Sequence, residues 1–203
     1  MRITRKTLVT TPASEPLALN ETKDFINVSG SDDDTLITNL IKAARQYVEQ
    51  NYNVAMITST WDFTMDRFPQ WKHTEDPHSL IEPLILPVQS ITSITYYDAN
   101  NDLQTLSASA YEAQLDNDRF PAIWRAYEQL WPETYVRRDA VKIRLVAGYG
   151  ATAASVPEPV RVAMLMIIKF LFDNREDMPI NKNIVPYPRA VEMLLRNFYY
   201  NDI

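Results

Sequence analysis

The chain has 203 residues, of which 46% are hydrophobic and 23% charged, so its composition is that of a folded globular protein rather than a disordered one. It contains no cysteine, which excludes disulfides, thiolate nucleophiles and zinc–thiolate sites and makes a reducing cytosol the expected compartment. The formal net charge is −6; residues 1–16 carry +2, which leaves −8 for residues 17–203. This acidic body argues against tight nucleic-acid binding, although DNA could still slide past it.

The amino terminus, MRITRKTLVTTPASEP, is basic and lacks the apolar run of a signal peptide. We expect residues 1–16 to form a flexible basic arm, in which Arg2, Arg5 and Lys6 are candidates for contact with a partner. Elsewhere the longest apolar run is broken by Lys169 and is much shorter than the roughly 20 residues of a membrane span. The sequence therefore predicts a soluble, non-secreted protein.

The stretch SDDDTLITNLIKAARQYVEQN predicts a helix from about Asp33 to Asn51. Its apolar positions recur at helical spacing, namely Leu36, Ile37, Leu40, Ile41, Ala44, Tyr47 and Val48. The three aspartates before this stripe are expected to accept hydrogen bonds from the first helical N–H groups and to oppose the helix dipole, rather than to bind a metal. A shorter helix is predicted around Leu19 to Ile26 and ends before Gly30.

The pattern becomes strand-like after Tyr52. Strands are predicted at Thr60–Asp66, Ile91–Tyr97, Leu103–Leu106, Tyr111–Leu115, Phe120–Trp124 and Val141–Leu145. Turn residues at 98–102 predict a hairpin, and residues 68–83 and 127–138 are predicted to be loops. Helices return where prolines occupy the first turn at 156–160, and a last helix is predicted to open at Tyr187-Pro188.

These elements predict an α+β chain in which helices at both ends form a helical bundle around an inserted small antiparallel β section. We expect one domain at residues 17–203, with helices at about 17–52 and 156–200 and the β insertion at about 57–147.

The residue inventory gives little support for catalysis. Three glycines cannot supply a phosphate loop or a dinucleotide fingerprint. The best metal candidate is the loop His73-Thr74-Glu75-Asp76-Pro77-His78, but no helical spacing fixes its ligands, and a solvated loop is the simpler interpretation. We predict no catalytic residue, no metal and no cofactor, while a carboxylate-based hydrolase stays an alternative among 26 acidic residues.

Aromatic residues concentrate in the β section, as they do in many protein- or carbohydrate-binding modules. The simpler interpretation is that they form the core of a small sheet. At the carboxy terminus, Phe198, Tyr199 and Tyr200 occupy successive faces of a helix, so one aromatic face should be exposed. A monomeric binding module is therefore a second alternative.

The order of several motifs resembles a known family. They are Asp33-Asp34-Thr35-Leu36 with Leu40-Ile41 and Glu49, then Trp61, Phe68-Pro69, Leu84-Ile85-Leu86-Pro87-Val88 and Ile94-Thr95-Tyr96-Tyr97-Asp98, and last Ala147-Gly148-Tyr149, Val156-Pro157-Glu158-Pro159-Val160 and Asp173-Asn174-Arg175-Glu176. Over residues 15–177 this succession resembles the head-to-tail connector (adaptor, or head-completion) family of tailed double-stranded DNA bacteriophages and prophages.

The resemblance implies a non-enzymatic virion protein of the head-tail junction, made in the host cytoplasm. Its copies would form a ring of roughly a dozen subunits beneath the portal protein and carry a downstream connector, stopper or tail protein, with DNA passing through the lumen. Because members of the family grip their neighbours with terminal segments, the resemblance implies contacts at both ends of the chain. The candidates are Arg2, Arg5, Lys6, Tyr187, Arg189, Arg196, Phe198, Tyr199 and Tyr200.

Overall fold

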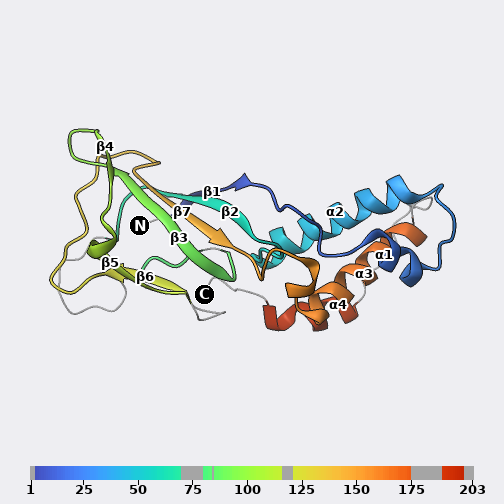
Figure 1. The fold of residues 1–203 in the computed structure, drawn as a ribbon. Coiled ribbons are helices and arrows are strands. Elements are labelled where there is room, and N and C mark those ends of the chain that lie inside the picture. Colours follow the sequence, from blue (N-terminus) through green and yellow to red (C-terminus); the bar gives the residue numbers. More distant parts are fainter. Residues whose placement is uncertain (1–2, 70–79, 84, 116–120, 175–188, 199–203) are drawn as a thin grey trace. The chain divides into compact units, whose positions relative to one another are not determined.

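A computed structural model describes residues 3–69, 80–83, 85–115, 121–174 and 189–198 (Figure 1). The chain divides into two compact units. The first, called the sheet unit here, comprises residues 1–11 and 58–148; the second, the helical unit, comprises residues 12–57 and 149–203. The chain therefore passes from one unit to the other three times.

The sheet unit is built on a five-stranded antiparallel sheet with the order β1-β2-β7-β3-β4 (Figure 1). Its strands are β1 (Ile3–Thr10), β2 (Ser59–Met65), β7 (Val141–Ala147), β3 (Val88–Tyr97) and β4 (Leu103–Thr105). A second sheet pairs β5 (Tyr111–Gln114) with β6 (Ala122–Arg125). The strand pattern of the β section is thus confirmed for the described residues.

Buried apolar residues alternate with more exposed polar residues along the central strands, and this alternation explains how the sheet packs. Phe63 pairs with Ile143 and Met65 pairs with Val141, and all four side chains are buried on one face of the sheet. The opposite face carries the intervening polar residues. There Asp62 accepts hydrogen bonds from the guanidinium of its cross-strand neighbour Arg144, at 2.7 and 2.8 Å. A shift of one residue along the strands would exchange the two faces and turn this ion pair toward the core.

The predicted hairpin between β3 and β4 is confirmed. The Asp98 carboxylate accepts hydrogen bonds from the backbone N–H groups of Asn100 and Asp102, and Asn101 adopts the left-handed conformation with φ of 67°. Asparagine is one of the few non-glycine residues that tolerate this conformation. The same residue type ends two helices at Asn27 and Asn53, which suits a chain with only three glycines.

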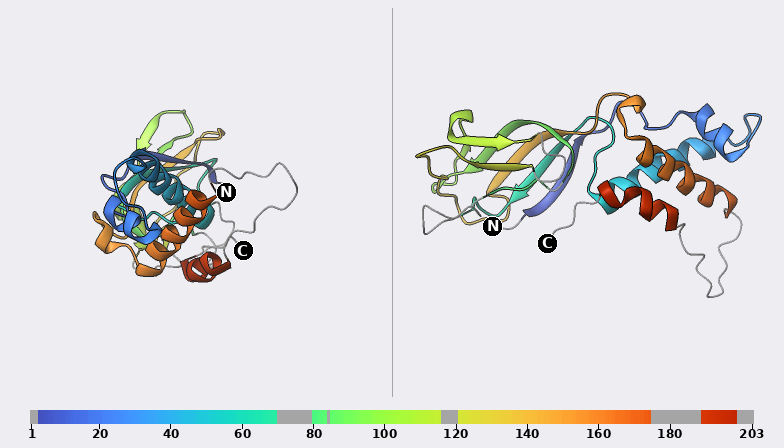
Figure 2. Two further views of the ribbon diagram at one scale, coloured as in Figure 1. Left: turned by 90° about the vertical axis from the view of Figure 1, so that its right-hand side faces the viewer. Right: turned by 90° about the horizontal axis from the view of Figure 1, so that it is seen from below.

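The helical unit contains α1 (Leu19–Ile26), α2 (Asp34–Tyr52), α3 (Glu158–Asp173) and α4 (Arg189–Leu195). Within this unit α3 packs against α2 on one side and α4 on the other, and α1 contacts both α2 and α3 (Figures 1 and 2). The core is formed by aliphatic side chains of all four helices, among them Ile26, Ile37, Ile41, Val48, Val160, Ala163, Met164, Ile167, Ile168, Val191 and Leu195. The helices predicted near these positions are confirmed.

Two local expectations at helix starts have different outcomes. The expected side-chain cap at the start of α2 is wrong, because the residue before the helix, Asp33, forms no capping hydrogen bond through its side chain. Asp34 instead pairs with Lys23, which also donates to the backbone oxygen of Gly30. The proline expected in the first turn of α3 is confirmed at Pro159, where a missing N–H costs nothing.

The predicted fold class is wrong in describing a helical bundle with a small inserted β section. The described residues contain seven strands in two sheets as well as four α-helices, and the β part forms a compact unit of its own. The difference arises partly at the amino terminus. Residues 3–10, expected within a flexible arm, form β1 and pair with β2, because Ile, Thr, Leu and Val suit a pleated surface.

Candidate interaction surfaces

The basic residues of the amino terminus lie on an edge strand. In β1, Arg5 is exposed, whereas Lys6 is half-buried with its Nζ 5.7 Å from the centroid of the Trp61 ring. Thr4 ties the strand to its surroundings by donating to the backbone oxygens of Thr64 and Arg138. Arg5 is therefore presented to solvent from a fixed strand. Arg2 lies outside the described residues.

The candidate residues of the carboxy terminus are divided between two faces. Arg189 and Arg196 are seven positions apart, in α4 and the turn that follows it, and both are exposed. Phe198 is half-buried, and its ring meets that of Tyr149 edge-on with 6.5 Å between centroids. Tyr187, Tyr199 and Tyr200 lie outside the described residues. The structure thus exposes the two arginines and holds Phe198 against the helical unit.

The outer side of α2 is a surface that the sequence pattern did not separate from the core. The apolar positions of this helix form two stripes. One, at Ile37, Ile41, Ala44 and Val48, is buried; the other, at Leu36, Leu40, Ala43 and Tyr47, is exposed or partly exposed. The sequence does carry one sign of this second stripe. A helix with one buried face needs only about three apolar residues in every seven, and α2 has more than that.

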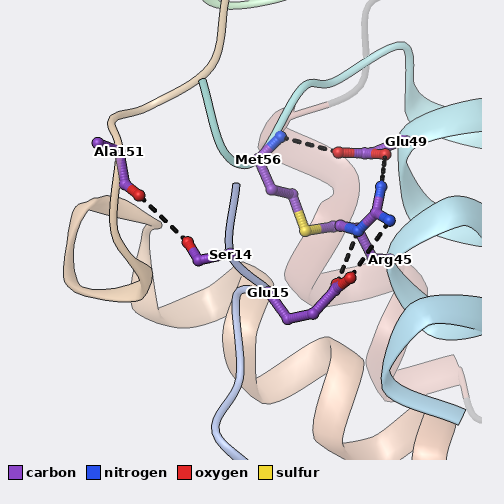
Figure 3. A network of polar contacts seen from close by, with 6 residues as sticks. All are labelled: Ser14, Glu15, Arg45, Glu49, Met56 and Ala151. Carbon is purple, nitrogen blue, oxygen red and sulfur yellow. Dashed lines mark hydrogen bonds and ion pairs between the residues drawn. The ribbon is translucent and has the colours of Figure 1, made fainter. Parts of the chain in front are cut away.

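A buried ion-pair network lies on the remaining side of α2 (Figure 3). Arg45 donates to Glu49 at 2.8 Å and to Glu15 at 2.8 and 3.4 Å, and Glu49 also accepts the backbone N–H of Met56 at 3.2 Å. Both Arg45 and Glu49 are 7% exposed. The guanidinium therefore has two carboxylate partners, and each oxygen of Glu49 has a donor, which is the condition for stable burial of charge.

Burial changes the acidity of this network. Burial raises the pKa of Glu49 above its usual range, although Arg45 and the Met56 N–H act in the opposite direction. Burial alone would lower the pKa of Arg45, but its hydrogen bond to Glu15 and the charges of both carboxylates outweigh that effect, so its pKa is raised. The arginine stays charged at every physiological pH.

The network also holds together the segments through which the chain enters and leaves the helical unit. Glu15 lies on the first segment and Met56 on the second. Ser14 donates to the backbone oxygen of Ala151 on the third, and Ile57 forms a parallel bridge with Gly150 (Figure 3 shows the first of these contacts). All three segments are thus fixed to α2 or to one another within this unit.

The sheet unit exposes several large apolar side chains beside its hairpin and in the loop after β6. The exposed fractions are 95% for Val136, 84% for Tyr127, 75% for Leu130 and 60% for Leu103. The backbone N–H of Tyr135 donates to the backbone oxygen of Tyr97, which keeps the loop next to β3. Exposed apolar groups of this kind often mark contact surfaces.

Other aromatic residues of the sheet unit pack against one another at the margin of its core: Phe68 is buried, and Tyr96, Trp124 and Trp131 are half-buried. Phe68 stacks on Trp131 with centroids 4.9 Å apart and meets Tyr96 edge-on at 5.6 Å. The indole N–H of Trp124 donates to Glu112 across the β5–β6 pair. The rings of Phe68, Tyr96 and Trp131 are thus packed together, and Trp124 is held beside β5.

The described residues contain no group of three or more histidine, cysteine, aspartate or glutamate side chains placed to hold a metal ion. The candidate loop with His73 and His78 lies outside them. In that same part of the chain, no helix combines the length and apolarity needed to cross a membrane.

Residues 17–127 match the family model described as phage gp6-like head-tail connector protein, and this range is more than half of the chain. The chain belongs to this family. The suspected resemblance is confirmed, and the match does not support the binding-module alternative. A search of curated proteins finds no match.

Solved structures share the fold of this connector protein over almost its whole length. A chain from the neck of an empty gene transfer agent (GTA) particle, computed with C6 symmetry, gives a TM-score of 0.76 at 16% identity, covering 98% of this chain and 97% of that one. A chain from the virion of a native GTA particle gives 0.75 at 18% identity, with coverages of 98% and 96%. A chain from the neck of a native GTA particle, computed with C12 symmetry, gives a TM-score of 0.74 at 17% identity, covering 98% of this chain and 97% of that one.

Proposed function

We propose that this connector protein forms a ring beneath the portal, joins the DNA-filled head to the tail and lines the channel through which DNA leaves. The observation that carries the proposal is its membership of the head-tail connector family. The fold shared with neck chains of GTA particles, along 98% of the sequence, supports the same position at the head-tail junction of a virion. Assembly would take place in the bacterial cytoplasm.

The C12 symmetry of one related neck supports a ring of about twelve copies. Such a ring forms when two different surfaces of one subunit meet on each neighbour and the rotation closes. The charge of −8 on residues 17–203 suits a channel wall, because like charge repels phosphates within a Debye length of about 8 Å at physiological salt. DNA would then pass without being held.

The ends of the chain are proposed as contacts with neighbouring proteins of the neck: the portal, the next connector or tail protein, and adjacent copies of this chain. Arg5 and Lys6 would contribute from β1, and Arg189, Arg196 and Phe198 from the carboxy-terminal part. Deleting everything after residue 186 would not test this cleanly, because Val191 and Leu195 belong to the buried core. A truncation after Phe198, together with exposed-arginine substitutions, leaves that core intact.

The decisive experiment compares particles produced with and without the gene for this protein. We expect DNA-filled heads that keep the portal but lack the neck and tail, seen by negative-stain electron microscopy, and restored tails when the full-length protein is added back. Complete, infectious particles formed in its absence would overturn the proposal. Arg189→Ala with Arg196→Ala is expected to weaken binding to portal-bearing heads, while Asp24→Ala, an exposed change on α1, serves as the control.

A further inference from the structure

The outer stripe of α2 has the composition of a contact surface. Leu36 and Tyr47 are 37% and 42% exposed, and Ala43 between them is exposed as well. The exposed positions that adjoin the stripe on the solvent side are uncharged, namely Asn39, Gln46 and Gln50. Depletion of charge around apolar and aromatic side chains distinguishes the centre of a protein–protein interface from ordinary surface.

Acidic groups lie at one end of this stripe. Asp32 is exposed and Asp33 is half-buried, directly before the first turn of α2. Asp34 is already paired with Lys23. One helical turn, about 5.4 Å, separates this acidic end from Leu36. The surface of α2 therefore combines negative charge at its start with an apolar stripe beyond it.

The outer face of α4 has the complementary composition. Met193 is 72% exposed, and Arg189 and Arg196 lie about one turn before and after it on the same face. Neither arginine forms an ion pair with another described residue. Glu192 adjoins them, which leaves a net charge of +1 among these four side chains. An exposed methionine between two arginines is an adaptable apolar contact with positive charge at its rim.

These two faces lie on opposite sides of α3 within the helical unit (Figures 1 and 2). We propose that the outer stripe of α2 docks against the outer face of α4 of a neighbouring copy, and that this contact closes the ring. Met193 would pack between Leu36 and Leu40, and the arginine that lies nearer the start of α2 would meet Asp32 and Asp33. On both faces about one helical turn lies between the apolar and the charged side chains. The apolar contact and the ion pair can therefore form at the same time. The inference rests on the proposed function.

Two different faces on opposite flanks are what a head-to-tail contact requires. A surface that recognises itself would give a twofold dimer instead, whereas a face that recognises a different face leaves one of each free until the ring closes. The opposite charges of the two faces favour this pairing and disfavour contacts of α2 with α2 or of α4 with α4.

The absence of cysteine allows a direct test by disulfide trapping in the full-length protein. Leu36→Cys or Leu40→Cys, each combined with Met193→Cys, is expected to give a ladder of cross-linked multimers after mild oxidation of assembled rings, because neighbouring thiols come within bonding distance. Matched controls place the α2 cysteine on the next residue back, Thr35→Cys or Asn39→Cys with Met193→Cys. These positions are exposed but turned by about 100°, and at least fivefold less multimer is expected.

A charge-exchange series gives a second readout. Asp32→Lys with Asp33→Lys, or Arg189→Glu with Arg196→Glu, should each lower the yield of rings about tenfold at low salt, and the chain carrying all four changes should recover most of it. Rings are counted by negative-stain microscopy and mass photometry, alone and on portal-bearing heads.

The outcomes separate this inference from the proposed function. Rings that form normally but give no ladder from the stripe positions, or an equal ladder from the controls, overturn the α2–α4 contact and leave the ring in place. Failure of the unsubstituted protein to form rings, both alone and on heads, overturns the proposed function together with the inference.

Discussion

Arg45 and Glu49 lie one turn apart on α2 with 2.8 Å between the guanidinium and the carboxylate, and both are almost completely buried. Glu15 and the backbone N–H of Met56 complete their hydrogen bonds, so the pair also fixes two segments at the edge of the helical unit. Buried charges of this kind are costly unless every partner is in place. The energetic consequences can therefore be tested one partner at a time.

Arg45→Met is expected to destabilise the helical unit by about 3–5 kcal/mol, because it leaves the carboxylate of Glu49 buried without its cation. Urea unfolding followed by circular dichroism at 222 nm measures this, since all four described α-helices belong to the helical unit. The double variant Arg45→Met with Glu49→Leu should regain much of the loss. A single variant as stable as the parent would show that the network contributes little.

The raised pKa of Glu49 predicts how stability depends on pH. In the range between its ordinary pKa and its higher pKa in the fold, the native state binds more protons than the unfolded state, so the free energy of unfolding falls as pH rises. Glu49→Gln removes this contribution. We expect the stability advantage of the parent over Glu49→Gln to shrink as the pH increases from about 4 upward. An advantage that grows over this range would mean that Arg45 outweighs burial and lowers the pKa.

Gly150 is predicted to be intolerant of a side chain for steric reasons. A Cβ at this position would lie 2.5 Å from the Cβ of Ser155, well inside van der Waals contact. Gly150→Ala is therefore expected to cost about 1–3 kcal/mol in unfolding experiments. Adding Ser155→Gly should restore part of the stability by removing the opposing atom. If the second change makes no difference, the clash is not the cause.

Removal of residues 1–11 is expected to destabilise the sheet unit, since β1 pairs with β2 along most of its length. Tryptophan fluorescence monitors this unit selectively, because all four tryptophans fall within residues 58–148. The truncated protein should unfold at a lower urea concentration, whereas Arg5→Ala with Lys6→Ala, which keeps the strand, should unfold close to the parent. Unchanged stability after truncation would fit a flexible arm instead.

Much of the local structure could be predicted from the sequence because it depends on near neighbours. The turn at Asp98 and the helix starting near Asp34 follow from side-chain chemistry and spacing within a few residues. The ion pair between Lys23 and Asp34 could not be predicted, since the two residues belong to different helices. Long-range partners of this kind leave no mark on a local pattern.

For the candidate surfaces too, some features follow from local spacing and others depend on tertiary packing. The arginines at 189 and 196 could be placed on one helical face from their spacing, but only packing shows that Val191 and Leu195 are buried behind them. For α2, the spacing of apolar residues predicted a helix with an apolar stripe. It could not predict which apolar side chains remain exposed, because neighbours such as Leu36 and Ile37 are equally hydrophobic. The choice is made by where α3 contacts the helix.

The sequence by itself determined the succession of helices and strands, the acidic body and the motifs of the connector family, since each is written in the order and type of residues. Only the tertiary structure decided that residues 3–10 join the sheet, that Arg45 has two carboxylate partners and that α2 keeps an exposed apolar stripe. The physical reason is that strand pairing, charge burial and side-chain exposure depend on residues far apart in the chain.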